Sequence, residues 1–274
     1  MTSCETIEAQ RFDLAQRVVV ITGCTGVLGS TYSRALAMRG ASLVLADLEI
    51  SRPHLFAERL AQETGANILG LSCDVSDEDD VVSLFCAAID CFGRVDVVLN
   101  NAAATGEHLL KLGNVFAKFE EYPLNIWEEV IKTNLTGVFL VAREGGKAML
   151  ASGGGSLINV SSIYGVVAPD HRLYDEMPFS SFPAYSSSKA GVHGLTLWLS
   201  TYWARSSIRV NTLVPGGVYN NHSDEFMNRY SQRTPMGRMA CSDDLVGAVV
   251  FLASDASIYV TGQQLIVDGG FTAW

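Results

Sequence analysis

A tyrosine followed by a lysine four residues later could carry out acid–base chemistry. Of the three tyrosines between residues 161 and 189, only Tyr185 has a lysine at this spacing, Lys189. On a helix, this spacing places two side chains on one face. A phenol beside an ammonium can donate and accept a proton near neutral pH. We therefore predict that Tyr185 is the acid–base of an enzyme, and that Tyr164 and Tyr174 are not.

The composition is that of a packed, acidic protein. The 274 residues are 48% hydrophobic and 18% charged, a balance that is typical of globular rather than disordered chains. The formal net charge of −10 argues against nucleic acid as a partner. We see no signal peptide and no apolar run of the ~18 residues that a membrane span needs. Six cysteines without a CxxC pair and histidines without metal-ligand spacing predict a cytoplasmic protein with no metal and no membrane partner.

Apolar runs alternate with amphipathic stretches of helical length along the chain. This alternation implies right-handed crossovers and a parallel sheet that is covered on both faces. We predict one α/β domain over residues 1–274, a Rossmann-type doubly wound sheet of about seven strands. The predicted strands cover residues 17–22, 41–47, 67–74, 95–101, 156–162, 208–214 and 263–270. The predicted helices cover residues 27–40, 51–65, 76–93, 125–150, 184–205 and 242–254, with Ser51 as a possible N-cap.

Three segments are too long for plain connections, namely 102–123, 163–183 and 216–240. Long loops in compact domains are usually functional. Because each follows a strand, they should gather at the carboxyl edge of the sheet, where ligands bind. We expect 163–183 and 216–240 to form the substrate pocket and 1–13 to be an N-terminal extension.

A glycine-rich turn between the first strand and the first helix could hold a dinucleotide. Gly23, Gly26 and Gly29 permit a tight turn and a close backbone approach, and the helix N-terminus offers N–H groups to a pyrophosphate. Asp47 ends the second strand, where a carboxylate can accept the ribose hydroxyls and repel a 2′-phosphate. Ser30 rather than a basic residue follows Gly29. These features predict NAD rather than NADP as the cofactor.

Together with Tyr185-x-x-x-Lys189, several motifs resemble the classical short-chain dehydrogenase/reductase family over about residues 14 to 271. They occur in the family's order: "TGCTGVLG", "CDVSD", "NNAA", "TNLTG", "NVSS", "YSSSK", "RVNTLVPGG" and "VDGG". The resemblance implies that the cofactor contacts Gly23, Thr25, Gly26, Val27, Leu28, Gly29, Asp47, Asp74, Val75, Asn101, Ala102, Tyr185, Lys189, Pro215, Gly216 and Val218.

The resemblance also implies the catalytic roles. Asn134 should hold a water in a proton relay, and Ser162 should polarise the substrate oxygen. Ser162 is favoured over Ser161 because a glycine, Gly165, follows it by three residues, as in the family. Tyr185 should exchange the proton, while Lys189 should bind the nicotinamide ribose and depress the tyrosine pKa.

The chain departs from the family pattern at three points. The glycine turn has G-x-x-G-x-x-G spacing, which is commoner in the extended branch of the family, but that branch has a further C-terminal substrate domain. Ala103 stands where the family usually has glycine, so a methyl group should lie near the cofactor. Asn220 stands where a threonine often contacts the cofactor carboxamide.

The segment between Ser162 and Tyr185 is about ten residues longer than in most classical members. Since both residues must reach one substrate oxygen, the additional residues should loop out as a pocket wall. Polar residues in this segment, among them His171, Arg172 and Tyr174, predict a polar pocket for an anionic sugar derivative. In this pocket we expect Arg172 to bind a phosphate or a carboxylate of the substrate. The run "SSIYGVVAPD" resembles a subgroup of dehydrogenases that is linked to bacterial surface-glycan and flagellin-sugar biosynthesis.

Other functions are compatible with these motifs. The substrate could instead be a free polyol, a sugar acid or a 3-oxoacyl thioester, and an NAD(H)-binding regulator without catalysis is the non-enzyme alternative. A homotetramer or homodimer is predicted, because "LTLWLSTYW" is apolar around most of a helix and the family commonly pairs through such helices.

Overall fold

All seven predicted strands pair in one parallel sheet, in the order β3-β2-β1-β4-β5-β6-β7. The computed structural model describes residues 11–104 and 109–274. The strands are β1 (Val18–Thr22), β2 (Ser42–Asp47), β3 (Ile68–Ser72), β4 (Val97–Asn100), β5 (Gly155–Val160), β6 (Ile208–Pro215) and β7 (Gln264–Val267). The prediction of a Rossmann-type doubly wound sheet is confirmed.

Each central strand is buried on both of its faces. In β1, alternate side chains point to opposite sides of the sheet, so that Val19 and Ile21 enter one core cluster and Val18 and Val20 enter the other. All five residues of β1 are buried. This explains why the strands read as continuous apolar runs and not as alternating ones.

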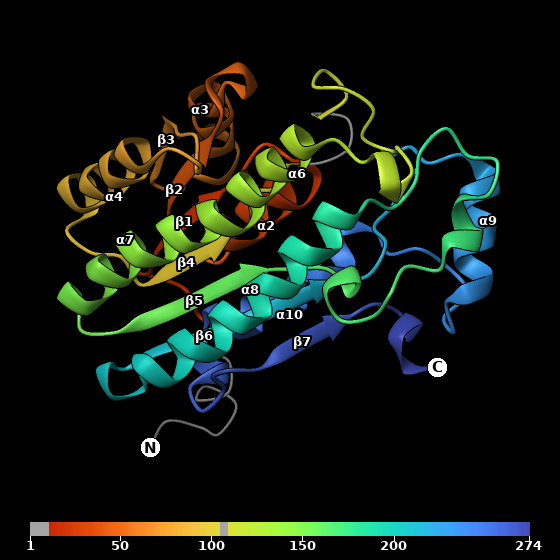
Figure 1. Cartoon of the computed structure of the whole chain (residues 1–274). Helices are drawn as coiled ribbons and strands as arrows, with labels where there is room; N and C mark the ends of the chain where they lie inside the picture. The colour runs from red at the N-terminus through yellow and green to blue at the C-terminus, as the bar shows by residue number, and fades with distance from the viewer. Residues whose placement is uncertain (1–10, 105–108) are drawn as a thin grey trace.

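Helices cover both faces of this sheet. Helices α2, α3 and α10 pack on one core cluster, and α4, α7 and α8 pack on the other. Figure 1 shows α4, α7 and α8 across the front of the sheet, with α2 and α10 behind it. The α-helices of the described residues are α2 (Val27–Ala37), α3 (Pro53–Thr64), α4 (Glu78–Phe92), α6 (Leu124–Ile131), α7 (Gly137–Ala151), α8 (Pro183–Tyr202), α9 (Asp224–Arg233) and α10 (Val246–Ala253).

The N-terminal caps of α4 and α3 can be compared with the sequence. The Asp77 carboxylate caps α4 by accepting from the N–H groups of Asp79 and Asp80. The predicted N-cap at Ser51 is wrong. Arg52 occupies that position with φ of 51°, and Ser51 ends a preceding 3-10 turn. Because the backbone of Arg52 is left-handed, the helix begins at Pro53 and does not extend back to Ser51.

The helix predicted over 125–150 is interrupted in the middle. A π-helical turn at Lys132–Thr136 separates α6 from α7. Such turns insert one extra residue into a helix and are frequent at functional sites. This one carries Asn134, a predicted catalytic residue, so the interruption sets where that side chain points.

The segment 216–240 is not only a loop, because it contains α9. The Ser223 hydroxyl caps this helix by accepting from the N–H of Phe226. Phe226 and Tyr230, one turn apart, are its buried residues. The predicted N-terminal extension over 1–13 and the loop over 102–123 fall partly outside the described residues.

Candidate active site

A cavity of about 710 Å³ opens at the carboxyl edge of the sheet. It lies where β1 is flanked by β2 on one side and β4 on the other, the point at which the strand order reverses. Eighteen of the predicted site residues line it: Gly23, Thr25, Gly26, Val27, Leu28, Gly29, Asp47, Asp74, Val75, Asn101, Ala102, Ser162, Tyr174, Tyr185, Lys189, Pro215, Gly216 and Val218. Asn134, His171 and Arg172 do not line it.

The glycine turn between β1 and α2 is tightly packed at two of its three glycines. Gly23 has φ of 64°, and a Cβ there would lie 2.8 Å from the Cα of Ala102. A Cβ on Gly29 would overlap the carbonyl oxygen of Gly23. At Gly26 the added carbon would meet only ordinary van der Waals contact, 3.5 Å from that same oxygen. The protein packing therefore leaves room at Gly26, where a ligand can approach the backbone.

The first turn of α2 offers an anion site to this cavity. Gly26 is its N-cap, and no side chain caps the helix. The N–H groups at an uncapped helix start are unpaired donors at the positive end of the helix dipole. Val27 and Leu28, the first two residues of α2, line the cavity. This arrangement can hold a pyrophosphate.

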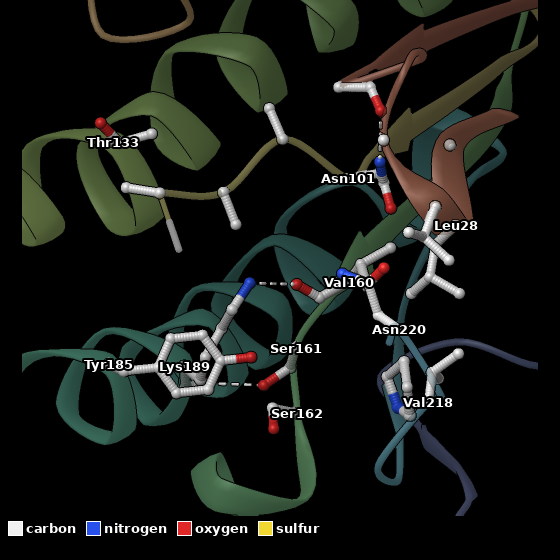
Figure 2. A pocket seen from close by; sticks show the side chains of 18 of the residues that line it. Leu28, Asn101, Thr133, Val160, Ser161, Ser162, Tyr185, Lys189, Val218 and Asn220 are labelled. Carbon is white, nitrogen blue, oxygen red and sulfur yellow. Dashed lines mark hydrogen bonds between the residues drawn. The ribbon is translucent and has the colours of Figure 1, made fainter. Parts of the chain in front are cut away.

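The residues at the ends of β3 and β4 are held by local hydrogen bonds. Asp74 accepts from the N–H and the hydroxyl of Ser76, which fixes its carboxylate at the cavity wall. Asn101 donates to the carbonyl oxygens of Thr22 and Gly23, both at 3.0 Å. The amide of Asn101 therefore ties the end of β4 to the glycine turn (Figure 2).

Tyr185, Lys189 and Ser162 meet at the end of β5. Figure 2 shows the Tyr185 ring beside Lys189, with Ser162 below the tyrosine. The Lys189 Nζ lies 5.8 Å from the centre of the Tyr185 ring and donates to the carbonyl oxygen of Val160 at 3.0 Å. The hydroxyl of Ser162 is close enough to the Tyr185 phenol to act on its pKa. The structure thus brings a proton donor, an ammonium and a second hydroxyl to one place.

Burial sets the pKa of both titratable groups in this cluster. It lowers the pKa of Lys189 to about 8, because the ammonium loses its hydration. Burial also raises the pKa of Tyr185, and the neighbouring Ser162 hydroxyl acts in the opposite direction. The expected depression of the tyrosine pKa by Lys189 is therefore not found in the protein alone.

The two serines of the pair have different surroundings. The Ser161 hydroxyl donates to the carbonyl oxygen of Lys189 at 2.9 Å and lies 3.1 Å from Nε2 of His193. These two contacts bind Ser161 to α8 and leave Ser162 facing Tyr185. A Cβ on Gly165 would lie 2.7 Å from the carbonyl carbon of Lys189, so glycine permits this close approach of the chain to α8.

His193 is a residue that the motifs did not indicate. It is buried, its Nδ1 has no hydrogen-bond partner among the described residues, and it lies one helical turn after Lys189. Burial, followed by the nearby Lys189 charge, lowers its pKa, so the ring is neutral. The spacing of four from Lys189 is the only signal that could have pointed to it.

The Asn134 side chain is hydrogen-bonded to the loop after β4. It is fully buried and accepts from the N–H of Ala104 at 2.7 Å. Its amide nitrogen lies 3.4 Å from the hydroxyl of Ser188, beside Lys189 in the chain. These contacts place Asn134 behind the cavity wall, and its role in a water relay stays a prediction.

The prediction that His171 and Arg172 line a polar pocket wall is wrong. Arg172 has 85% of its side chain exposed and pairs with Asp170 at 2.7 Å. His171 is also exposed, and neither residue reaches the cavity. The hydrogen bonds to Asp170, two residues away in the chain, satisfy the guanidinium at the surface. Tyr174 alone of the three predicted substrate residues lines the cavity.

The observed wall is mainly aromatic. It is built from the segment after Ser162 and from α9 with its flanks, and it consists of Ile163, Tyr164, Tyr174, Asn220, His222, Phe226, Tyr230 and Met239. Most of these side chains belong to one apolar cluster, which also includes Leu173 and Phe179. The loop lengths predicted that these segments form a wall, but not which side chains face inward.

The family model described as enoyl-(acyl carrier protein) reductase matches residues 25–272 of this chain. The chain is 32% identical to D-threitol dehydrogenase of Mycolicibacterium smegmatis, over 95% of both chains. The chain belongs to the short-chain dehydrogenase/reductase family. Enzymes of this family are oxidoreductases that bind a nicotinamide dinucleotide and a small-molecule substrate.

Other members of the short-chain dehydrogenase/reductase family show how widely their activities differ. Post-translational flagellin modification protein A of Campylobacter coli is 28% identical, with 94% of this chain and 99% of that protein covered. A gluconate 5-dehydrogenase from Burkholderia cenocepacia, solved with NADP and tartrate, has a TM-score of 0.86 and 30% identity, with 97% and 99% coverage. Membership in the family therefore leaves both the cofactor and the substrate to be argued from the site.

Two further features bear on the class of protein. No helix of residues 11–104 and 109–274 is long and apolar enough to cross a membrane. Within the same ranges, no group of three or more His, Cys, Asp or Glu side chains is placed to hold a metal ion.

Proposed function

We propose that this protein is an NAD-dependent dehydrogenase that interconverts a secondary alcohol and a ketone on a hydroxylated, sugar-derived substrate. The observation that carries this proposal is the common cavity. The glycine turn with Asp47 and the Tyr185–Lys189–Ser162 cluster line the same 710 Å³ space. A regulator that only binds NAD(H) would not need the Tyr185–Lys189–Ser162 cluster.

Each residue of the cluster has a definite task in alcohol oxidation. Tyr185 takes the proton of the substrate hydroxyl, and Ser162 holds the oxygen beside it. Bound NAD⁺ supplies the hydride acceptor. Protonated Lys189, together with the positive charge that an oxidised nicotinamide would bring, would favour the tyrosinate against the opposing effect of burial. Lys189, held by the Val160 carbonyl, keeps a proton donor next to Tyr185.

NAD rather than NADP is supported by the charges at the end of β2. Asp47 and Leu48 line the cavity there, and the described residues place no arginine or lysine beside them in its wall. A 2′-phosphate would meet the Asp47 carboxylate without a cation to neutralise it. A gluconate 5-dehydrogenase of similar structure was solved with NADP, so the NAD proposal rests on the residues of this chain and not on family membership.

Replacement of Tyr185 tests the reaction. Tyr185→Phe should lower kcat by ~10²–10⁴-fold, the range for general acid–base catalysis, while NADH binding, followed by fluorescence, stays near that of the wild type. Tyr259→Phe, fully exposed and outside the cavity, is the matched control. Retention of more than about a tenth of kcat by Tyr185→Phe would remove this residue from the role.

A polyol or a sugar acid is better supported as substrate than the other classes. D-threitol dehydrogenase and gluconate 5-dehydrogenase are among the similar proteins. Lys189 is the only cation among the described residues that line the cavity, so a sugar phosphate or sugar nucleotide has no second cation to bind it. A panel of polyols, sugar acids, sugar nucleotides and an acyl thioester, followed by NADH absorbance, ranks these classes. Fastest turnover of the thioester would overturn this choice.

A further inference from the structure

Two tyrosines stand beside the predicted catalytic group, and the reaction described above uses neither. Tyr164 lies in the 3-10 turn η4 (Ile163–Gly165), and its N–H donates to the Ser162 hydroxyl at 3.2 Å. Tyr174 ends the 3-10 turn η5 (His171–Tyr174) of the additional segment. Both side chains line the cavity. Tyr164 is therefore bonded through its backbone to Ser162, the residue proposed to hold the reacting oxygen.

The two phenols form a pair. Their hydroxyl oxygens are 2.7 Å apart, and either can be the donor. Tyr174 is held in place by aromatic neighbours, Phe226 at 5.6 Å and Phe179 at 6.0 Å between ring centres. Such contacts fix the ring and therefore the direction of the hydroxyl. The two phenols are therefore held in fixed positions in the cavity wall, and they do not behave as two independent surface side chains.

The pair keeps unused hydrogen-bonding capacity. Each phenol has one donor and can accept, and their mutual bond uses one donor and one acceptor site. The second O–H donor and further acceptor sites have no partner among the described residues. Burial raises the pKa of Tyr174 to about 12 and that of Tyr164 further, so both hydroxyls stay protonated. A neutral donor–acceptor pair matches an alcohol group, which also donates and accepts.

The surroundings of the pair do not favour an anion. Lys189 is the only lysine or arginine among the described residues of the cavity wall, and its ammonium is bonded to Val160. His222 stacks on Phe226 at 5.1 Å, and burial lowers its pKa, so it is neutral. The N–H of Tyr164 donates to the Ser162 hydroxyl, so the pair lies beside the residue predicted to hold the reacting oxygen.

We propose that the Tyr164–Tyr174 hydroxyl pair binds a second hydroxyl group of an uncharged polyol, close to the carbinol that is oxidised. This inference rests on the proposed dehydrogenase function and narrows its substrate. A site built to bind a hydroxyl rejects an analogue that lacks it, because its buried polar groups are then left unpaired.

The test compares a substrate with and without the second hydroxyl. The wild type, Tyr164→Phe and Tyr174→Phe are assayed with NAD on vicinal cyclohexanediol and on cyclohexanol. We expect the wild type to prefer the diol, and each variant to lower the ratio of kcat/KM for diol to that for monool roughly 5- to 100-fold. Tyr259→Phe, fully exposed and outside the cavity, should leave the ratio unchanged.

A second comparison tests the charge of the substrate. D-threitol is compared with D-threonate, the acid that carries a carboxylate at one end. Faster turnover of the acid would overturn the preference for an uncharged substrate. Equal loss on diol and monool in both tyrosine variants, or no loss in either, would overturn the hydroxyl site and leave the dehydrogenase function standing. Failure of the wild type to oxidise any alcohol would overturn both.

Discussion

The carboxylate of Asp47 accepts two hydrogen bonds from Thr25, one from its N–H at 2.9 Å and one from its hydroxyl at 2.6 Å. The other carboxylate oxygen accepts from the N–H of Leu48. Asp47 therefore joins the end of β2 to the glycine turn and keeps acceptor capacity for a ribose hydroxyl. One residue thus positions the glycine turn and also supplies the charge that, under the proposed NAD preference, would repel a 2′-phosphate.

Removal of the Asp47 charge should weaken the choice of cofactor. We expect the wild type to favour NAD over NADP by roughly 10²-fold in kcat/KM, since a buried phosphate beside a carboxylate costs a few kcal/mol. Asp47→Asn keeps the shape but not the charge, and should narrow this gap about tenfold. Asp90→Asn, exposed on α4, is the control. Equal kcat/KM of the wild type for the two cofactors would contradict the prediction.

Alanine at two glycines of the turn should separate cofactor binding from folding. At Gly26 the added methyl group meets only ordinary contacts, so the free energy of unfolding should stay within about 1 kcal/mol of the wild type. NADH affinity should fall about tenfold or more, because the methyl group occupies space on the side of the cavity.

Gly29→Ala is the comparison, because its methyl group would overlap the Gly23 carbonyl. It should lower the free energy of unfolding by about 1–3 kcal/mol or more. Urea denaturation and NADH fluorescence titration measure the two quantities. A Gly26→Ala protein that binds NADH as tightly as the wild type would show that the cofactor does not approach this backbone.

The buried ammonium of Lys189 should make stability depend on pH. Its pKa falls from 10.5, the ordinary value for a lysine, to about 8 in the fold. Between these values the unfolded chain holds a proton that the folded chain has lost, so the free energy of unfolding rises with pH. Below about pH 8 this contribution is absent, because lysine is then charged in both states.

Lys189→Met removes this titration. Relative to the variant, the wild type should gain stability as the pH rises from about 8 to about 10.5, by a total on the order of 3 kcal/mol for the whole shift. Urea denaturation of both proteins at several pH values measures the difference. Parallel curves would contradict the buried, depressed lysine.

Exposed aromatic and aliphatic side chains on α7 and α8 predict self-association. Trp198 and Tyr202 of α8 stack at 4.7 Å and are 60% and 64% exposed, and Leu197 of α8 and Phe139 of α7 are also exposed. Clusters of exposed apolar side chains of this kind mark protein interfaces. We expect a dimer or tetramer at micromolar concentration by light scattering, and a monomer for Trp198→Glu. Ile50→Glu, on the separate turn η1 (Glu49–Ser51), should keep the wild-type mass, whereas a monomeric wild type would contradict the prediction.

The sequence determined the features that depend on local pattern. Apolar runs such as "VVVIT" predict buried parallel strands, because a strand covered on both faces has no polar side to show. Gly23 and Gly29 stand where any side chain would collide with the turn, so their residue type alone reports the geometry. The spacing of Tyr185 and Lys189 is likewise a property of one helix.

Only the tertiary structure decided which side chains face the cavity. Arg172 could have gripped an anion, but Asp170 lies two residues away and binds it at the surface. Tyr174, in the same segment, turns inward because Phe226 of α9 packs against it. The direction of the Lys189 pKa shift also depends on how deeply the fold buries the ammonium. Composition shows which groups a loop carries, whereas competition between local partners and distant packing decides which of them the substrate meets.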